Sequence, residues 1–329
     1  MKKILFAVMA FALLAGVSSC KKEMEGKYAP KEKIQSVYQE HAVYYGGEVI
    51  HQEPKFKSEE WSWVNDRLDR IVYFEQYTYG VDENGEPETE YEQLYVQLFS
   101  YDSDGRLTKS EILGQANMEA ICEYDGKELK TMTVKEDGEM VVTYQFNHDG
   151  KRITSFDLTL GEEYWEMDEK VAKQLERVSP LRFVLSAEPA TEVMAATKDC
   201  AKRASKAGSK ANAVIHFEME WNGDNVSQIS ATYMGETMQY NFNYDTKNNP
   251  FYNLFDVVNT VDNNFMPFMP LSKNNVTAIA VILSEDGETE TETMQYTYTY
   301  NDKDYPTSRK EEETYGHSRF ERTYYYEYK

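Results

Sequence analysis

The sequence has little proline, little cysteine and, after its first twenty residues, no long apolar run. Only 9 prolines and 3 cysteines occur among 329 residues. This composition does not suit a proline-rich disordered chain, and three cysteines cannot form the dense disulfide framework of a small secreted domain. A transmembrane helix needs about 20 consecutive apolar residues, so we expect none in the body of the chain.

Motifs for catalysis or metal binding are also missing. None of the five histidines, which are His41, His51, His148, His216 and His317, is spaced as a metal ligand with another His or Cys. There is no HExxH, CxxC or GxSxG sequence and no glycine-rich phosphate loop. The segment Asp102–Gly105 resembles the start of a calcium loop, but a hairpin turn explains it. We therefore expect no cofactor, no metal and no catalytic residue, hence a protein that is not an enzyme.

The first residues form a processing signal. Lys2 and Lys3 precede an apolar run from Ile4 to Val17, which is typical of a secretory signal peptide over residues 1–19. The end of this segment, Val17-Ser18-Ser19-Cys20, resembles the bacterial lipobox. That resemblance implies that Cys20 is acylated and becomes the mature N-terminus. The expected membrane contact is through these acyl chains, with residues 20–33 as a charged tether.

The mature chain is strongly acidic. Removal of Lys2 and Lys3 leaves 33 basic and 57 acidic side chains, a formal charge of −24. Nucleic acids are therefore unlikely partners on electrostatic grounds, because their binding depends on cations that neutralise phosphates. Apart from Cys20, the remaining cysteines are Cys122 and Cys200, which could form one disulfide or stay as two free thiols.

The body of the chain repeats one unit. A strand of alternating apolar and polar residues ends on an aromatic residue, is followed by Asp, Asn or Gly and often a basic residue, and then returns. The units are Tyr101-Asp102-Ser103-Asp104-Gly105-Arg106, Tyr124-Asp125-Gly126-Lys127, Phe146-Asn147-His148-Asp149-Gly150-Lys151, Trp221-Asn222-Gly223-Asp224, Tyr244-Asp245-Thr246-Lys247 and Tyr300-Asn301-Asp302-Lys303. Aromatic positions 101, 124 and 146, and then 221 and 244, are 22 to 23 residues apart, which predicts one hairpin per repeat.

Counting back by twos from these aromatic residues gives apolar columns. They are Met118, Ala120, Cys122, Tyr124; Met140, Val142, Tyr144, Phe146; Ile215, Phe217, Met219, Trp221; Met238, Tyr240, Phe242, Tyr244; and Met294, Tyr296, Tyr298, Tyr300. A period of two with one apolar face indicates antiparallel strands. We predict an all-β fold: a long antiparallel hairpin meander that forms a strongly twisted sheet or a partly open barrel, with a small helical cap. The hairpins occupy residues 34–186 and 213–329.

Two segments depart from the repeat. Residues 187–212 are rich in Ala, Lys, Ser and Thr and are predicted to be a flexible insert. Within residues 250–271, Asn249 and Pro250 favour a helix start, and Phe251, Leu254, Phe255 and Val258 recur at helical spacing. This segment is predicted to plug the sheet, or alternatively to line a binding cleft. The candidate ligand or cap surface is Phe251, Leu254, Phe255, Phe265 and Phe268.

The chain resembles a family of Bacteroidota lipoproteins whose globular part is a domain of unknown function. The resemblance rests on the lipobox, the Tyr-Asp turns, and the pair of segments Tyr244–Phe251 and Ser272–Thr277. The likeness is strongest over residues 214–329. It implies a β-rich fold and a place in the cell envelope, with the outer membrane expected and the membrane face undecided. It implies no activity and no functional residues.

Three functions follow as hypotheses. The first is a non-catalytic, lipid-anchored cell-envelope protein that binds a small molecule, glycan or protein through an aromatic β face. The second is a carrier of a lipid or other hydrophobic molecule in a cavity under the sheet. The third is a glycosidase, because two carboxylates from distant strands leave no spacing signal; Glu162, Glu163 and Glu166 beside Trp165 are one such acidic group.

Overall fold

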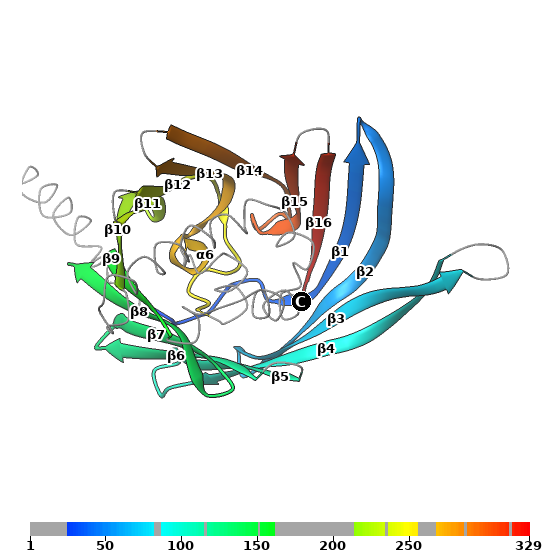
Figure 1. Ribbon diagram of the computed structural model, residues 1–329. Coiled ribbons are helices and arrows are strands. Elements are labelled where there is room, and N and C mark those ends of the chain that lie inside the picture. Colours follow the sequence, from blue (N-terminus) through cyan, green and yellow to red (C-terminus); the bar gives the residue numbers. More distant parts are fainter. Residues whose placement is uncertain are drawn as a thin grey trace, which may run out of the picture.

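The protein forms a closed barrel of antiparallel strands (Figure 1). The computed structural model describes residues 25–81, 87–114, 117–150, 152–161, 214–233, 236–255, 268–285, 288–315 and 318–329. Each strand pairs with the next one along the chain, and β1 (Ile34–Tyr45) pairs with β16 (Ser318–Tyr328) to close the ring. The others are β2 (Glu48–Val64), β3 (Arg67–Val81), β4 (Pro87–Tyr101), β5 (Leu107–Gly114), β6 (Met118–Asp125), β7 (Glu128–Glu136), β8 (Glu139–Asp149), β9 (Arg152–Leu160), β10 (Val214–Asn222), β11 (Asn225–Tyr233), β12 (Glu236–Asn248), β13 (Asn274–Glu285), β14 (Glu288–Tyr300) and β15 (Pro306–Tyr315).

The barrel confirms the predicted all-β meander and closes it completely. Val37 of β1 pairs with Tyr326 of β16, and the ladder continues to Tyr45 opposite Ser318. Closure leaves no sheet edge open, which removes the unpaired backbone groups that would otherwise invite another chain to pair. The two predicted sets of hairpins also form one sheet, because β9 pairs directly with β10 across the segment between them.

Successive hairpin turns alternate between the two ends of the barrel. We call one end the near rim, because it carries residues 25–33, the start of β1 and the end of β16; the other end is the far rim. The repeated aromatic-Asp turns all lie on the near rim. Their geometry fits their composition: Asn65 and Asp66 both have positive φ, as a two-residue hairpin with a type I′ turn requires.

The apolar columns face inward and form the core, as the alternation predicts. Tyr144, Phe156 and Phe217 from three adjacent strands are fully buried, and the rings of Phe156 and Phe217 stack with centroids 4.8 Å apart. Cys122 lies in the same core and is 4% exposed; Cys200, its possible disulfide partner, lies outside the described residues. The interleaved positions face outward and are mostly polar, so the strands have a dry inner face and a wet outer face.

The segment after β12 differs from its prediction. Asn249 caps the chain as expected, since its Oδ1 accepts a hydrogen bond from the Phe251 amide at 2.9 Å. Residues 250–255 nevertheless form turns rather than a helix. Asn253 adopts a φ of 68°, and its amide donates to the carbonyl of Pro270 at 2.8 Å. This left-handed residue ends the helical path after one turn.

One short helix, α6 (Phe268–Leu271), lies in the described part of the same segment. None of the described helical segments has the length and apolar character that a membrane-crossing helix requires. Three parts of the chain named above lie outside the described residues. They are residues 1–24 with Cys20, the insert at 187–212, and the acidic group around Trp165.

Candidate functional site

The aromatic residues that end the strands form a hydrogen-bonded belt inside the near rim. In six hairpins, the aromatic side chain near the end of the second strand donates to a backbone carbonyl at the start of the first strand. The pairs are Trp63 to Ile34 at 2.7 Å, Tyr101 to Leu68 at 2.8 Å, Tyr124 to Leu107 at 2.7 Å, Trp221 to Ile153 at 2.7 Å, Tyr298 to Val276 at 2.7 Å and Tyr328 to Pro306 at 2.8 Å.

This belt explains why the repeat contains Tyr or Trp rather than Phe at most of these positions. Each donor is half-buried against the core, where a polar group without a partner costs about 1–3 kcal/mol. The carbonyl at the start of each hairpin supplies that partner. Burial raises the pKa of Tyr298 well above the usual value, which keeps its hydroxyl protonated as a donor. These aromatic residues of the repeat therefore stabilise the barrel from its inner face.

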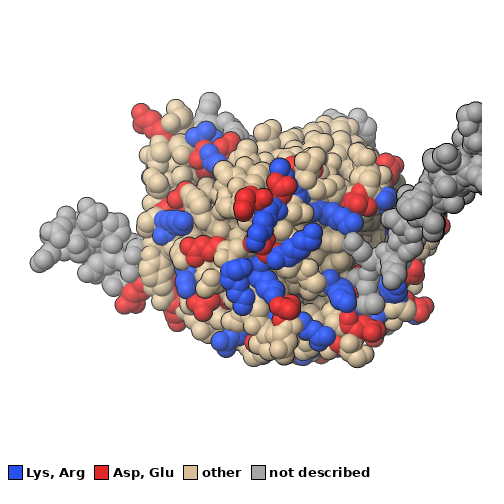
Figure 2. All heavy atoms as spheres, turned by 180° about the vertical axis from the view of Figure 1, so that it is seen from behind, with Lys and Arg blue, Asp and Glu red and all other residues tan. Residues whose placement is uncertain are grey.

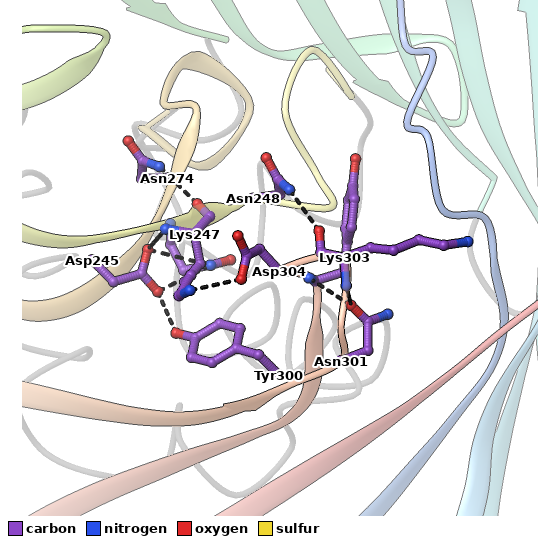
Figure 3. Close-up of polar contacts among 10 residues, drawn as sticks. Asp245, Lys247, Asn248, Asn274, Tyr300, Asn301, Lys303 and Asp304 are labelled. Carbon is purple, nitrogen blue, oxygen red and sulfur yellow. Dashed lines mark hydrogen bonds and ion pairs between the residues drawn. The ribbon is translucent and has the colours of Figure 1, made fainter.

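The motif that carries the family resemblance forms a second polar cluster on the near rim (Figure 3). At its centre is Asp245, whose Oδ1 accepts hydrogen bonds from the amides of Lys247 at 2.9 Å and Asn275 at 3.1 Å. The hydroxyl of Tyr300 donates to the other carboxylate oxygen. Beside it, Lys247 pairs with Asp304 at 2.6 Å.

Asparagine side chains complete this cluster by bonding to backbone. Asn248 donates to the carbonyl of Lys303 at 3.0 Å, and Asn274 donates to that of Lys247 at 2.7 Å. Asn301 accepts from the amides of Lys303 and Tyr305 at 3.0 Å. These contacts join β12, β13 and the β14–β15 turn, as Figure 3 shows. The Asp and Asn side chains are thus used to fix irregular backbone.

A different kind of polar cluster lies inside the barrel wall, among apolar and aromatic neighbours. The guanidinium of Arg309 on β15 contacts Glu311 with Nη2 and Oε1 2.8 Å apart. Arg322 on β16 lies across the strand pair, with Nη1 3.6 Å from Glu311 Oε2 and 3.3 Å from the Tyr324 hydroxyl. We call Arg309, Glu311 and Arg322 the arginine floor.

The arginine floor carries one net positive charge in a strongly acidic protein. The side chains of Arg309 and Arg322 are only 13% and 6% exposed. Arg309 also stacks over Tyr324, with its guanidinium carbon 4.5 Å from the ring centroid. Burial opposes its charge, but Tyr326 and Glu311 outweigh this effect and raise the pKa of Arg309. Both arginines therefore stay charged.

Strand β1 adds a neutral histidine to the floor. His41 faces Arg322 in the register and contacts the side-chain amide of Gln39. Burial, followed by the nearby charges of Arg322 and His51, lowers the pKa of His41 to about 3. The imidazole is therefore uncharged at neutral pH. Oε1 of Gln39 and Nε of Arg309 are both buried without a hydrogen-bond partner among the described residues.

The arginine floor lies where the dry core ends. Along the inward face of β1, exposure is 2% at Val37, 3% at Gln39 and 9% at His41, and it reaches 57% at Tyr45 on the far rim. On β16 the buried residues likewise begin at Arg322, while Phe320 is half-exposed. Beyond the floor, the inward side chains at the ends of these two strands are therefore more exposed than those below it.

The residues of the predicted cap surface do not form one surface in the structure. Leu254 and Phe255 are buried in the core, and Phe251 is half-buried against Trp61 and Tyr326, with ring centroids 6.3 Å away in each case. Phe268 begins α6, and Phe265 lies outside the described residues. A cavity of about 10 Å³, the size of one water, is lined by Phe251, Tyr298, Arg309 and Tyr326 among others.

Sequence reasoning missed the arginine floor. Counting back by twos from Tyr328 passes through Tyr326 and Tyr324 to Arg322. The alternation therefore predicts that the Arg322 side chain points inward. It makes no such prediction for Arg309 and Glu311, because β15 has charged residues at both phases, including Lys310 and Glu312.

His216 belongs to a polar cluster on the outer surface of the barrel. It lies on the outer wall between Asp157 at 2.6 Å and Glu218 at 2.9 Å, with its side chain 49% exposed. Hydrogen bonds to these two carboxylates raise its pKa. Exposed pairs of this kind contribute at most about 1 kcal/mol. Within the described part of the chain, no three His, Cys, Asp or Glu side chains converge in a way that could hold a metal ion.

Comparison of the whole chain with solved structures finds two porin-like proteins. The chain is similar to a porin-like protein from Bacteroides uniformis, with 11% identity, a TM-score of 0.47, and coverage of 90% of this chain and 98% of the other. A porin-like protein from Bacteroides vulgatus gives 11% identity, a TM-score of 0.31, and coverage of 91% and 99%. No protein-family model and no curated protein matches the sequence.

Proposed function

We propose that the protein is a non-catalytic, lipid-anchored cell-envelope protein whose barrel stands outside the bilayer and binds a ligand through its open far end. The observation that carries this proposal is the arginine floor, which places two charged arginines at the boundary between a packed core and solvent-exposed inward side chains.

The chemistry of the outer wall supports a position outside the bilayer. A membrane-spanning barrel presents an apolar band to lipid and a polar interior. This barrel has the opposite arrangement, with outward rows such as Glu123, Thr131, Gln145 and Asp157 in register across four strands. Figure 2 shows Lys, Arg, Asp and Glu spread over the face that it displays. An Arg or Lys facing lipid would cost about 2–4 kcal/mol at mid-bilayer, and an Asp or Glu would cost less.

The composition of the floor suggests which ligands would bind. Arginine guanidinium groups match carboxylate, sulfonate or phosphate oxygens, and the adjacent Tyr324 and half-exposed Phe320 offer aromatic surface. A ligand with an acidic group and an apolar or aromatic body would satisfy both. The cavity beside Arg309 has a volume of about 10 Å³, room for one water, and so gives the hydrophobic carrier no support.

Binding of 8-anilinonaphthalene-1-sulfonate, an anionic aromatic dye, tests the proposal under native conditions. The wild-type protein should bind it saturably, and the Arg309→Gln/Arg322→Gln variant should bind at least tenfold more weakly. Lys310→Gln/Arg319→Gln is the matched control, because it removes two positive charges from the outer wall, where these side chains are 34% and 44% exposed.

Arg322→Lys keeps the charge and should retain most of the binding, and thermal unfolding of each variant checks that the barrel is folded. N-phenyl-1-naphthylamine, which has a similar aromatic body without the sulfonate, should bind wild type and variant equally. Equal binding of the anionic dye by the wild type and the double arginine variant would overturn the proposal.

A further inference from the structure

We infer that the near rim of the barrel lies against the membrane surface and that the far rim points away from it. The partner of the near rim is the headgroup layer of the membrane that holds Cys20. The inference rests on the proposed lipid anchor, and adds to it a fixed orientation of the barrel.

The first described residues are bonded firmly to the near rim. The amide of Glu25 donates to the carbonyl of Lys127 at 3.2 Å, and its carboxylate accepts from the amide of Leu129 at 2.6 Å. The same carboxylate contacts His148 at 3.0 Å. The carbonyl of Gly26 accepts from the Leu107 amide at 2.9 Å. Residues 25 and 26 therefore contact the start of β5, the β6–β7 turn and the end of β8.

Close packing holds this segment in place. Gly26 has a φ of 72°, and a Cβ there would lie 1.8 Å from the hydroxyl of Tyr124, so only glycine fits. Tyr28 is 3% exposed, and its hydroxyl donates to the carbonyl of Pro250 at 2.9 Å. The segment is thus part of the barrel end and cannot act as a swinging linker.

The remaining tether is short compared with the barrel. Five residue steps separate Cys20 from Glu25, and a fully extended chain covers at most about 18 Å over that distance. Strand β1 has 12 residues, which at about 3.3 Å each and a tilt of about 40° gives a height of roughly 30 Å. A lipid on Cys20 therefore keeps the near rim close to the bilayer, while the far rim beside β1 is out of its reach.

The near rim has the chemistry of a surface that meets lipid headgroups. Cations lie over aromatic rings at four of the near-rim connections: Arg67 over Tyr101 at 5.6 Å, Arg106 over Tyr124 at 4.5 Å, Arg152 over Trp221 at 5.4 Å, and at β12–β13 Lys273 over Tyr252 and Lys247 over Tyr300, both at 5.9 Å. Arg152, Lys273 and Lys247 are 45%, 38% and 37% exposed, and each pairs with an exposed aspartate, Asp224 for the first two and Asp304 for Lys247. Basic and aromatic side chains are favoured at the membrane interface.

The competing orientation is a barrel that lies on its side, on the wall formed by β5, β6 and β7 next to the tether. That wall carries Lys109, Lys130 and Lys135 beside Glu111, Glu119 and Glu123, and Lys109 pairs with both Glu111 and Glu119. The upright orientation and the lying one place different residues near the lipid, so a depth measurement separates them.

The test is fluorescence quenching on vesicles of phosphatidylethanolamine and phosphatidylglycerol that contain a lipid with a headgroup nitroxide. A coumarin amino acid replaces one exposed residue at a time in the acylated full-length protein. Asp104 and Asp302 report the near rim, Glu48 and Glu139 report the far rim, and Glu123 reports the wall. We expect quenching at positions 104 and 302 to exceed that at 48 and 139 at least threefold.

Stronger quenching at 123 than at 302 would mean that the barrel lies on its side, and equal quenching at both rims would mean that it has no fixed orientation; either result overturns the inference. A second preparation, with Cys20 coupled to a maleimide lipid in a Cys200→Ser chain, gives the same comparison without cellular acylation. Absence of acyl chains on the native protein would refute the proposed anchor alone, whereas the wrong quenching order in the coupled protein would refute the orientation alone.

Discussion

Replacing Phe255 with alanine separates a structural role for the segment after β12 from a role in ligand entry. Phe255 is 1% exposed, and its carbonyl lies 3.9 Å from the thiol of Cys122. Burial of about 100 Å² of ring surface contributes about 2–3 kcal/mol at 25 cal/mol per Å². The cavity left behind adds about 1–2 kcal/mol where the surroundings do not collapse. The unfolding free energy should therefore fall by about 3–5 kcal/mol.

Urea unfolding followed by near-ultraviolet circular dichroism measures this loss. With a denaturant slope of about 3 kcal/mol per molar for a protein of this size, the midpoint should fall by about 1–1.5 M. Phe255→Leu fills most of the space and should recover more than half of the loss. Phe251→Ala is the comparison at the same segment, and since Phe251 is half-buried it should lose less stability.

Unchanged stability together with altered dye binding would refute this reasoning. If Phe255→Ala unfolds within 0.3 M of the wild-type midpoint and binds N-phenyl-1-naphthylamine differently, Phe255 lines a ligand entrance rather than the core. The carrier function would then displace the function proposed above.

Three further outcomes are expected. Cys20→Ala should move the protein from the membrane pellet to the soluble envelope fraction, and its retention after a carbonate wash would contradict the anchor. Tyr298→Phe should lower the unfolding free energy by about 1–2 kcal/mol, because the carbonyl of Val276 loses its donor; an unchanged midpoint would mean that the belt contributes no stability. Because the pKa of His41 is lowered to about 3 from 6.5, the unfolded state binds its proton first, so stability is present above pH 6.5 and declines as the pH falls toward 3. Between pH 7 and 4.5 the wild type should lose about 2–3 kcal/mol more than His41→Gln, and parallel pH curves for the two would refute a buried neutral His41.

The sequence predicted the strands and their faces well because both depend on local patterns. The period of two placed Cys122 and Tyr144 in the core, and the Asp-Gly and Asn-Gly pairs predicted hairpin turns. The 22- to 23-residue spacing returned each aromatic residue to the same rim, although the near rim itself could not be recognised before the strands were arranged.

Closure and the irregular segment depended on distant contacts. The pairing of Ile34 with Tyr328 has no local signal, so an open barrel and a closed one fit the sequence equally. The helix predicted after Pro250 had correct spacing and a correct cap. Turns form there instead, because Asn253 bonds to Pro270, a contact that no short window contains. The arginine floor was missed for a similar reason, since Arg309 and Arg322 meet only through strand pairing.

The pairing of the first strand with the last has a consequence for how the chain matures. Strand β1 is synthesised and exported early, yet its partner β16 comes from the last twelve residues of the chain. Until these arrive, β1 exposes an unpaired edge that can pair with another chain. Joining the two ends also closes the longest loop in the molecule, a contact of high sequence separation that slows folding. Until β16 has paired with β1, the barrel therefore remains incomplete. A nonsense mutation that removed β16 would leave β1 without its partner permanently.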